Sequence, residues 1–156
     1  MRHEDYDVII KTKMAGQYFN YPNKILVDNF KKNIDNLIIT NTGDSSRLIK
    51  DSVAVIGLNS TTLVEAIIAD KVIIMPYFGD IINNQPWSFF DQHPALIKYA
   101  KNLKELENYI LLDYSDYKYD EEIKKDFLEK YISTSIGNAS LRAENEIIKE
   151  INKFNK

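Results

Sequence analysis

Residues 53–66 have the sequence VAVIGLNSTTLVEA, in which an apolar run leads through small polar residues into a helical pattern. The apolar run, 53–57, is typical of a strand that is covered on both faces of a sheet. The helix is predicted at 62–69, so it follows the strand after a very short turn. A strand that passes into a helix in this way indicates a βαβ unit.

The same alternation extends on both sides of this segment. Further strands are predicted at 8–10, 37–40 and 72–76, with a weaker one at 95–99, and helices at 22–33 and 45–50. Alternating strands and helices predict an α/β fold, here a Rossmann-like three-layer αβα domain with a parallel sheet of about five strands.

Extra helices are predicted at the C-terminal end of the chain, because apolar residues recur there at helical spacing. The three stripes are Leu103, Leu106 and Ile110; Ile123, Phe127, Leu128 and Tyr131; and Leu141, Ile148, Ile151 and Phe154. The Tyr- and Asp-rich stretch 113–120 between the first two is predicted to be a surface connection.

Length and composition exclude several classes of protein. The 156 residues suit a single domain, 1–156, and the net charge of −3 gives no basis for binding nucleic acid. The absence of cysteine excludes disulfides, thiolate catalysis and cysteine-ligated zinc. No apolar run approaches the ~20 residues of a membrane span, so we expect a cytoplasmic chain without a transmembrane segment.

Candidate binding residues follow the third predicted strand. In open parallel sheets, ligands bind beyond the carboxyl ends of the strands. The turn after this strand contains Asn59, Ser60, Thr61 and Thr62 and leads into a helix N-terminus, which is suited to a phosphate group. Glu65 lies one turn into the helix, where its carboxylate can accept hydrogen bonds from ribose hydroxyls. The alternative is that Ser60 or Thr61 only caps the helix and that Glu65 completes a capping box.

Two other strand ends offer residues for the same site. Lys11 and Lys13 follow the first strand, where they can meet phosphates or can be ordinary surface lysines. Pro76, Tyr77 and Phe78 follow the fourth strand, and together with Gly57 we expect them to line a pocket for the base or the sugar. Trp87 and Phe90 can add to this pocket, pack against another domain, or form a minor cluster under a loop.

We predict no metal site and no cofactor. The sequence Asp5-Tyr6-Asp7 has the form of a metal-binding motif, but it precedes a strand and therefore lies at the wrong end of the sheet. His3 and His93 show no ligand spacing with carboxylates.

Four segments resemble a known family. They are KTK at 11–13, NSTTLVEA at 59–66, KVIIMP at 71–76 and IGNASLR at 136–142. Together they are similar to the C-terminal, donor-binding domain of GT-B glycosyltransferases, especially bacterial enzymes of capsule and surface-polysaccharide biosynthesis. The likeness extends over residues 7–154, and its specific part is these segments. Asn138 and Ile136 depart from the acidic pattern of the family, and no histidine accompanies the first lysine strand.

The resemblance implies a function. The chain is expected to be the donor-binding half of a two-domain enzyme that transfers a sugar from a nucleotide-activated donor to a surface-glycan acceptor. Ser60, Thr61 and Thr62 then contact the phosphates of the donor, Glu65 holds the ribose, and Lys11 or Lys13 offsets the phosphate charge. The family needs no bound metal.

The catalytic base is expected outside this chain, in a missing N-terminal Rossmann-like domain. The full-length enzyme is expected in the cytoplasm, with peripheral contact at the inner face of the membrane left open. Two alternatives are the corresponding half of a nucleotide-sugar epimerase and a non-catalytic nucleotide- or glycan-binding module.

Overall fold

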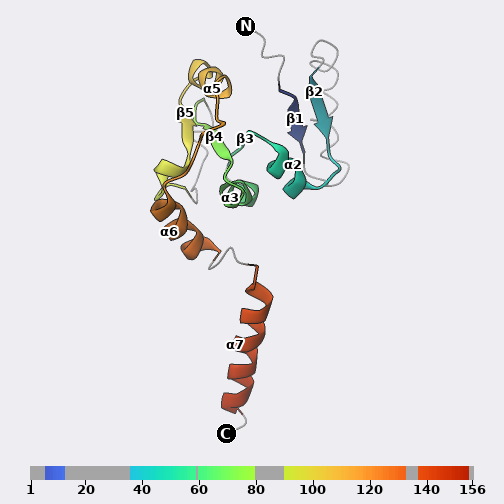
Figure 1. Cartoon of the computed structure of the whole chain (residues 1–156), viewed down its shortest axis with the longest axis vertical. Helices are drawn as coiled ribbons and strands as arrows, with labels where there is room; N and C mark the ends of the chain where they lie inside the picture. Colours follow the sequence, from blue (N-terminus) through green and yellow to red (C-terminus); the bar gives the residue numbers. More distant parts are fainter. Residues whose placement is uncertain (1–5, 13–35, 59, 80–89, 133–136, 155–156) are drawn as a thin grey trace. The chain divides into compact units, whose positions relative to one another are not determined.

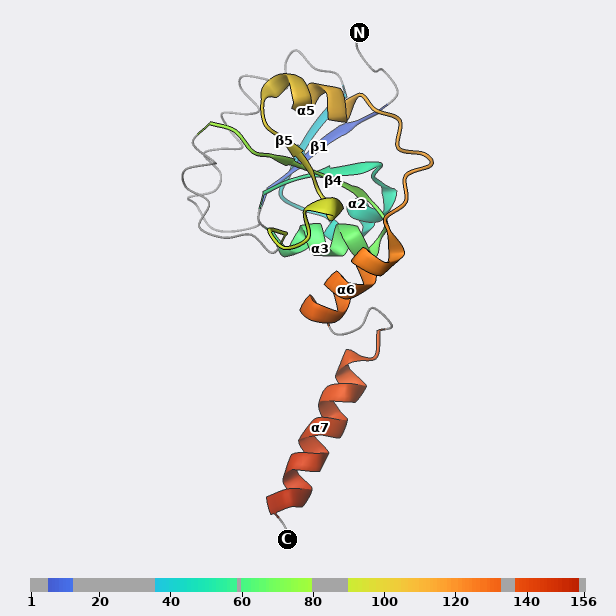
Figure 2. The same ribbon diagram turned by 90° about the vertical axis from the view of Figure 1, so that its left-hand side faces the viewer.

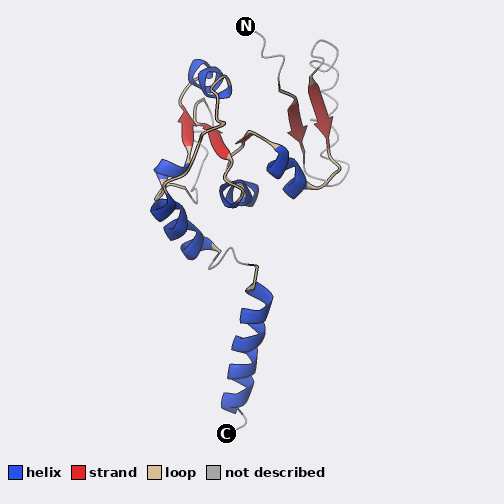
Figure 3. Cartoon of the chain, viewed as in Figure 1, coloured by secondary structure: helices blue, strands red, loops and turns tan. Residues whose placement is uncertain are grey.

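A computed structural model of the chain describes residues 6–12, 36–58, 60–79, 90–132 and 137–154. These residues form a mixed α/β structure with five α-helices and two parallel sheets (Figures 1 and 3). The chain divides into two compact units, Met1–Leu48 and Ile49–Lys156. Several residues named in the sequence analysis lie outside the described ranges. These are the predicted helix 22–33 and Asp5, His3, Trp87 and Ile136.

The first unit contains a two-stranded parallel sheet. Strands β1 (Val8–Lys11) and β2 (Leu37–Thr40) pair in register from Val8 opposite Leu37 to Lys11 opposite Thr40. Both strands were predicted from short apolar runs, and both are confirmed. The helix α2 (Ser45–Asp51) follows β2 and is also confirmed, with the Asp44 carboxylate accepting a hydrogen bond from the Ser46 amide at 2.9 Å.

The second unit is built on a three-stranded parallel sheet in the order β3-β4-β5. Its strands are β3 (Ala54–Ile56), β4 (Val72–Pro76) and β5 (Lys98–Ala100). Helix α3 (Thr61–Ile68) connects β3 to β4, and α5 (Leu103–Ile110) follows β5. These two helices lie on opposite faces of the sheet (Figures 1 and 2).

The prediction of about five strands in one sheet is wrong for the part of the chain described here, which has sheets of two and three strands. The central strand of the larger sheet is β4, whose residues Val72 to Met75 are at most 1 % exposed. The strand expected to be covered on both faces, β3, is instead an edge of this sheet, and its Ile56 is 48 % exposed. A continuous apolar run does not say how many neighbours a strand has.

The fifth strand begins later than predicted. Residues Pro94–Leu96 form a 3₁₀ turn, and β5 starts only at Lys98. Proline has no amide hydrogen to donate to a neighbouring strand, which favours a turn at this position.

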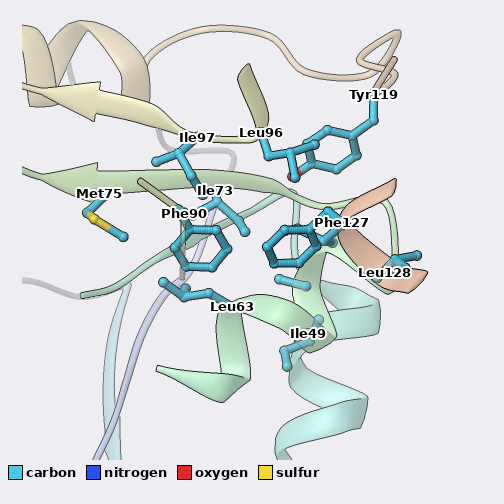
Figure 4. Close-up of a cluster of buried hydrophobic side chains, with 12 residues drawn as sticks. Ile49, Leu63, Ile73, Met75, Phe90, Leu96, Ile97, Tyr119, Phe127 and Leu128 are labelled. Atoms are coloured by element: carbon cyan, nitrogen blue, oxygen red, sulfur yellow. The ribbon is translucent and has the colours of Figure 1, made fainter. Parts of the chain in front are cut away.

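The core of the second unit lies between the sheet, α3 and α6 (Glu121–Tyr131). Phe90 and Phe127, both 0 % exposed, stack with ring centroids 5.5 Å apart (Figure 4). They pack with Leu63 of α3 and with Ile73 and Met75 of β4. Phe90 is therefore a core residue and forms part of a hydrophobic cluster rather than a ligand pocket. The apolar face predicted for α6 is confirmed.

The connection 113–120 is packed more closely than the predicted surface loop. Tyr119 is 5 % exposed, and its hydroxyl donates a hydrogen bond to the Lys71 carbonyl at 2.7 Å. The Lys98 ammonium lies 5.4 Å from the centroid of the Tyr117 ring and 5.9 Å from that of Tyr114. The tyrosines thus attach this connection to the amino ends of β4 and β5.

The last helix, α7 (Ala139–Phe154), confirms the third predicted stripe as helical. All of its residues are exposed, including Leu141, Ile148, Ile151 and Phe154. None of the helices in the described ranges is long and apolar enough to cross a membrane.

Candidate functional site

The start of α3 lies just beyond the carboxyl end of β3, as predicted. Ser60 is the N-cap residue in extended conformation, and its hydroxyl accepts a hydrogen bond from the Thr62 amide at 3.3 Å. The Ser60 carbonyl accepts a second one from Leu63 at 3.0 Å. Ser60 therefore caps the helix, while Thr61 is exposed and Thr62 is half-buried. Asn59 lies outside the described residues.

Glu65 takes no part in this cap. A capping box needs a glutamate three residues after the cap, whereas Glu65 follows Ser60 by five. At the start of α5, in contrast, a glutamate does take part in the cap: the Glu105 amide donates to the Asn102 side chain at 2.9 Å, and the Glu105 carboxylate accepts from the Lys101 amide at 2.8 Å.

The carboxylate of Glu65 is exposed, and among the described residues it forms no hydrogen bond or ion pair. The capping-box alternative is therefore wrong for Glu65. Its side chain is accessible to a ligand one turn beyond the start of the helix.

The packing of the turn against α3 explains why residue 57 is a glycine, which the sequence alone did not reveal. A Cβ at this position would lie 3.0 Å from Cδ2 of Leu63, which is 1 % exposed. The Gly57 amide donates to the Ile74 carbonyl at 3.2 Å and so extends the pairing of β3 with β4. The close approach of the turn to α3 therefore leaves little room for a side chain at this position.

The end of β4 contributes Pro76, Tyr77 and Phe78, which are all half-buried. The Tyr77 amide donates to the Ala100 carbonyl at 2.7 Å, so Tyr77 stays paired with the end of β5. Its ring meets that of Tyr99 edge-on, with centroids 5.7 Å apart and planes at 79°. Burial raises the pKa of the Tyr99 hydroxyl above its ordinary value, and the negative charge of Asp91 adds to this.

Sequence reasoning missed two residues at this end of the sheet. Tyr99 lies in β5, and the exposed Lys101 follows that strand directly. Their position became visible only from the register of β5, which pairs Tyr99 with Met75 and Ala100 with Pro76.

The predicted lysines belong to the other unit. Lys11 is the last residue of β1, is half-buried and pairs with Thr40, while Lys13 lies outside the described residues. The structure thus places Ser60, Glu65 and Tyr77 in one unit, and Lys11 at the carboxyl end of a strand in the other.

A shallow hollow of about 430 Å³ lies elsewhere, beside the turn that precedes β5, and is lined by Gln92, His93, Pro94, Ala95, Glu122, Ile123 and Asp126. Since the strands are parallel, this is the opposite end of the sheet from the start of α3. The His93 side chain is 9 % exposed, and its Nδ1 lies 3.9 Å from the Asp126 carboxylate. Its ring meets that of Phe127 edge-on at 5.2 Å, so His93 is a core residue.

Among the described residues, no group of three or more histidine, aspartate or glutamate side chains is placed to hold a metal ion. Comparisons with protein-family models, with curated proteins and with solved structures found no match to the chain. The assignment of a function therefore rests on the residues at the carboxyl end of the sheet.

Proposed function

We propose that the chain is the donor-binding half of a GT-B glycosyltransferase, with a Rossmann-like fold, that acts in bacterial capsule or surface-polysaccharide biosynthesis. The observation that carries this proposal is the exposed carboxylate of Glu65, one turn beyond the Ser60 cap of α3. It lies past the carboxyl end of a parallel strand, where open α/β sheets bind their ligands.

The start of α3 suits the phosphates of a nucleotide sugar. A helix N-terminus carries partial positive charge and amide donors, and the first turn of α3 contains no acidic residue. The start of α5, in contrast, is already neutralised by Glu105. The hydroxyls of Thr61 and Thr62 add donors beside the cap. The phosphate-binding roles of Lys11, Lys13 and Asn59 stay predictions from the sequence.

Glu65 suits the ribose. An ionised carboxylate has two acceptor oxygens, which match the two neighbouring hydroxyls of a ribose ring. The residue is exposed, and among the described residues its carboxylate has no partner that competes with a ligand. Pro76 at the end of the adjacent strand β4, with Tyr77 and Phe78 directly after it, lines the space for the base or the sugar, and Gly57 holds the turn against α3.

In this function the chain stabilises the leaving group. As the bond from the sugar to the phosphate breaks, negative charge grows on the phosphate oxygen, and the dipole of α3 and the hydroxyls at its start stabilise it. The base that takes the proton of the acceptor hydroxyl comes from an N-terminal Rossmann-like domain. The full-length enzyme then works in the cytoplasm.

Nucleotide binding tests the proposal. Thermal unfolding and ligand-detected NMR with CMP, CDP, UDP and GDP should show that one diphosphate binds and stabilises the chain. Glu65→Ala should weaken this binding by roughly tenfold or more, because it removes charge-assisted hydrogen bonds. Glu107→Ala, which removes an exposed glutamate from α5, is the matched control and should have no effect.

Two results would contradict the proposal. A chain that responds to none of the four nucleotides has no donor site. Sugar transfer by this chain alone onto a defined glycan would show that it is not half of an enzyme.

A further inference from the structure

Tyr77 and Tyr99 lie on the same face of the sheet as α3. Side chains alternate between the two faces along a strand, and Ile73 and Met75 of β4 point into the core that contains Leu63 of α3. The next residue in that alternation is Tyr77, which is still paired with β5. Tyr99 is opposite Met75 in the register and packs against the same core.

The two rings are also at the same end of the sheet as the start of α3. Tyr77 directly follows β4, one strand away from the turn that leads into α3, and Tyr99 lies one strand further. Neighbouring strands are about 4.8 Å apart. A group attached to a phosphate at the start of α3 can therefore extend across these two tyrosines.

The arrangement of the rings fits a sugar better than a nucleobase. A flat base gains most by stacking on an aromatic face, whereas a sugar presents both apolar C–H groups and hydroxyls. Tyr77 and Tyr99 meet edge-on at 79°, so the pair offers an aromatic ring for C–H groups and phenolic hydroxyls for hydrogen bonds. A phenolic hydroxyl can both donate and accept hydrogen bonds, as the hydroxyls of a sugar require.

We infer that Tyr99, together with Tyr77, forms the seat for the sugar ring of the donor and is a specificity-determining residue of this site. The inference rests on the proposed function, since it requires a nucleotide sugar whose phosphates lie at α3. In this arrangement the two tyrosines bind the hexose and do not bind the nucleobase. Tyr99 thus distinguishes a nucleotide sugar from the free nucleotide.

The test compares each free diphosphate with its hexose derivative on the whole chain. UDP, UDP-glucose, GDP and GDP-mannose are titrated by calorimetry into the wild type, Tyr99→Leu and Tyr99→Phe. Tyr99→Leu should weaken binding of the preferred nucleotide sugar roughly fivefold and leave the free diphosphate unchanged. Tyr99→Phe keeps the ring and should cause a smaller loss, about twofold. Tyr109→Phe, on the α5 side of the sheet, is the matched control and should change neither affinity.

Any other result of these titrations contradicts the role inferred for Tyr99 or the proposed function. Equal weakening of the diphosphate and the nucleotide sugar gives Tyr99 a nucleobase-binding or purely structural role, and unchanged binding of both removes Tyr99 from the site. Equal affinity of the wild type for both ligands removes the sugar seat altogether. Binding of none of the four ligands overturns the proposed function and this inference with it. If Tyr99→Leu does not fold, the comparison of Tyr99→Phe with Tyr109→Phe decides.

Discussion

Gly57→Ala is expected to destabilise the second unit by about 1 kcal/mol. The new Cβ would lie 3.0 Å from Cδ2 and 3.6 Å from Cγ of Leu63. Leu63 is 1 % exposed and is enclosed by the core, so it cannot move aside freely. Overpacking of this kind costs about 1–3 kcal/mol. Alanine also restricts the unfolded chain, which favours folding by about 0.4–1 kcal/mol. The clash is the larger effect.

A double-mutant cycle separates the clash from the backbone effect. The free energy of unfolding is measured in urea by circular dichroism for Gly57→Ala, Leu63→Val and the double variant. Leu63→Val shortens the side chain that the new methyl group meets. The cost of Gly57→Ala should therefore fall by about 1 kcal/mol in the Leu63→Val background. A gain in stability from Gly57→Ala, of equal size in both backgrounds, would show that the turn and α3 are not in close contact.

Three further substitutions test the packing of the second unit. Tyr119→Phe should cost about 1 kcal/mol at neutral pH, because the Lys71 carbonyl loses its donor. Burial raises the folded pKa of Tyr119 above its ordinary 10.0. The hydrogen bond of the Tyr119 hydroxyl therefore stabilises the fold fully below pH 10, and this stabilisation is lost as the pH rises further. In urea titrations above pH 10, Tyr119→Phe should lose less stability with rising pH than the wild type does. An equal loss in both proteins would show that this hydroxyl is exposed to water. Phe127→Ala removes a ring that stacks on Phe90 and should cost about 3–5 kcal/mol, whereas a loss below 1 kcal/mol would contradict the core assignment. Asp120→Ala removes the cap of α6 and should cost about 1 kcal/mol, with an unchanged midpoint of unfolding as the contrary result.

The sequence was sufficient to predict those strands and helices that a local pattern of residues determines. β2 and β4 have the predicted boundaries, because each is a short apolar run limited by residues that favour turns or loops. The start of α3 was predicted for the same reason, since Ser60 lies between a strand and a helical pattern.

The sequence was not sufficient to predict features of the structure that depend on contacts between residues far apart in the chain. The edge position of β3 depends on which strands pair, and this is not encoded in its own apolar run. The late start of β5 depends on a turn at Pro94, and this shift hid Tyr99 and Lys101. The role of Glu65 depended on the exact cap residue, because a cap at Thr62, two residues after the observed cap Ser60, would have made Glu65 part of a capping box.

Backbone NMR of the labelled chain, titrated with CDP, UDP and GDP, tests whether the donor binds at the start of α3. If the donor binds there, one diphosphate shifts the amide signals of Thr61 and Thr62 most strongly, and Glu65→Ala weakens this response. The amides around the hollow at His93 should stay unchanged, since it lies at the opposite end of the sheet. Shifts centred on His93 with none at Thr61 and Thr62 would contradict the assignment.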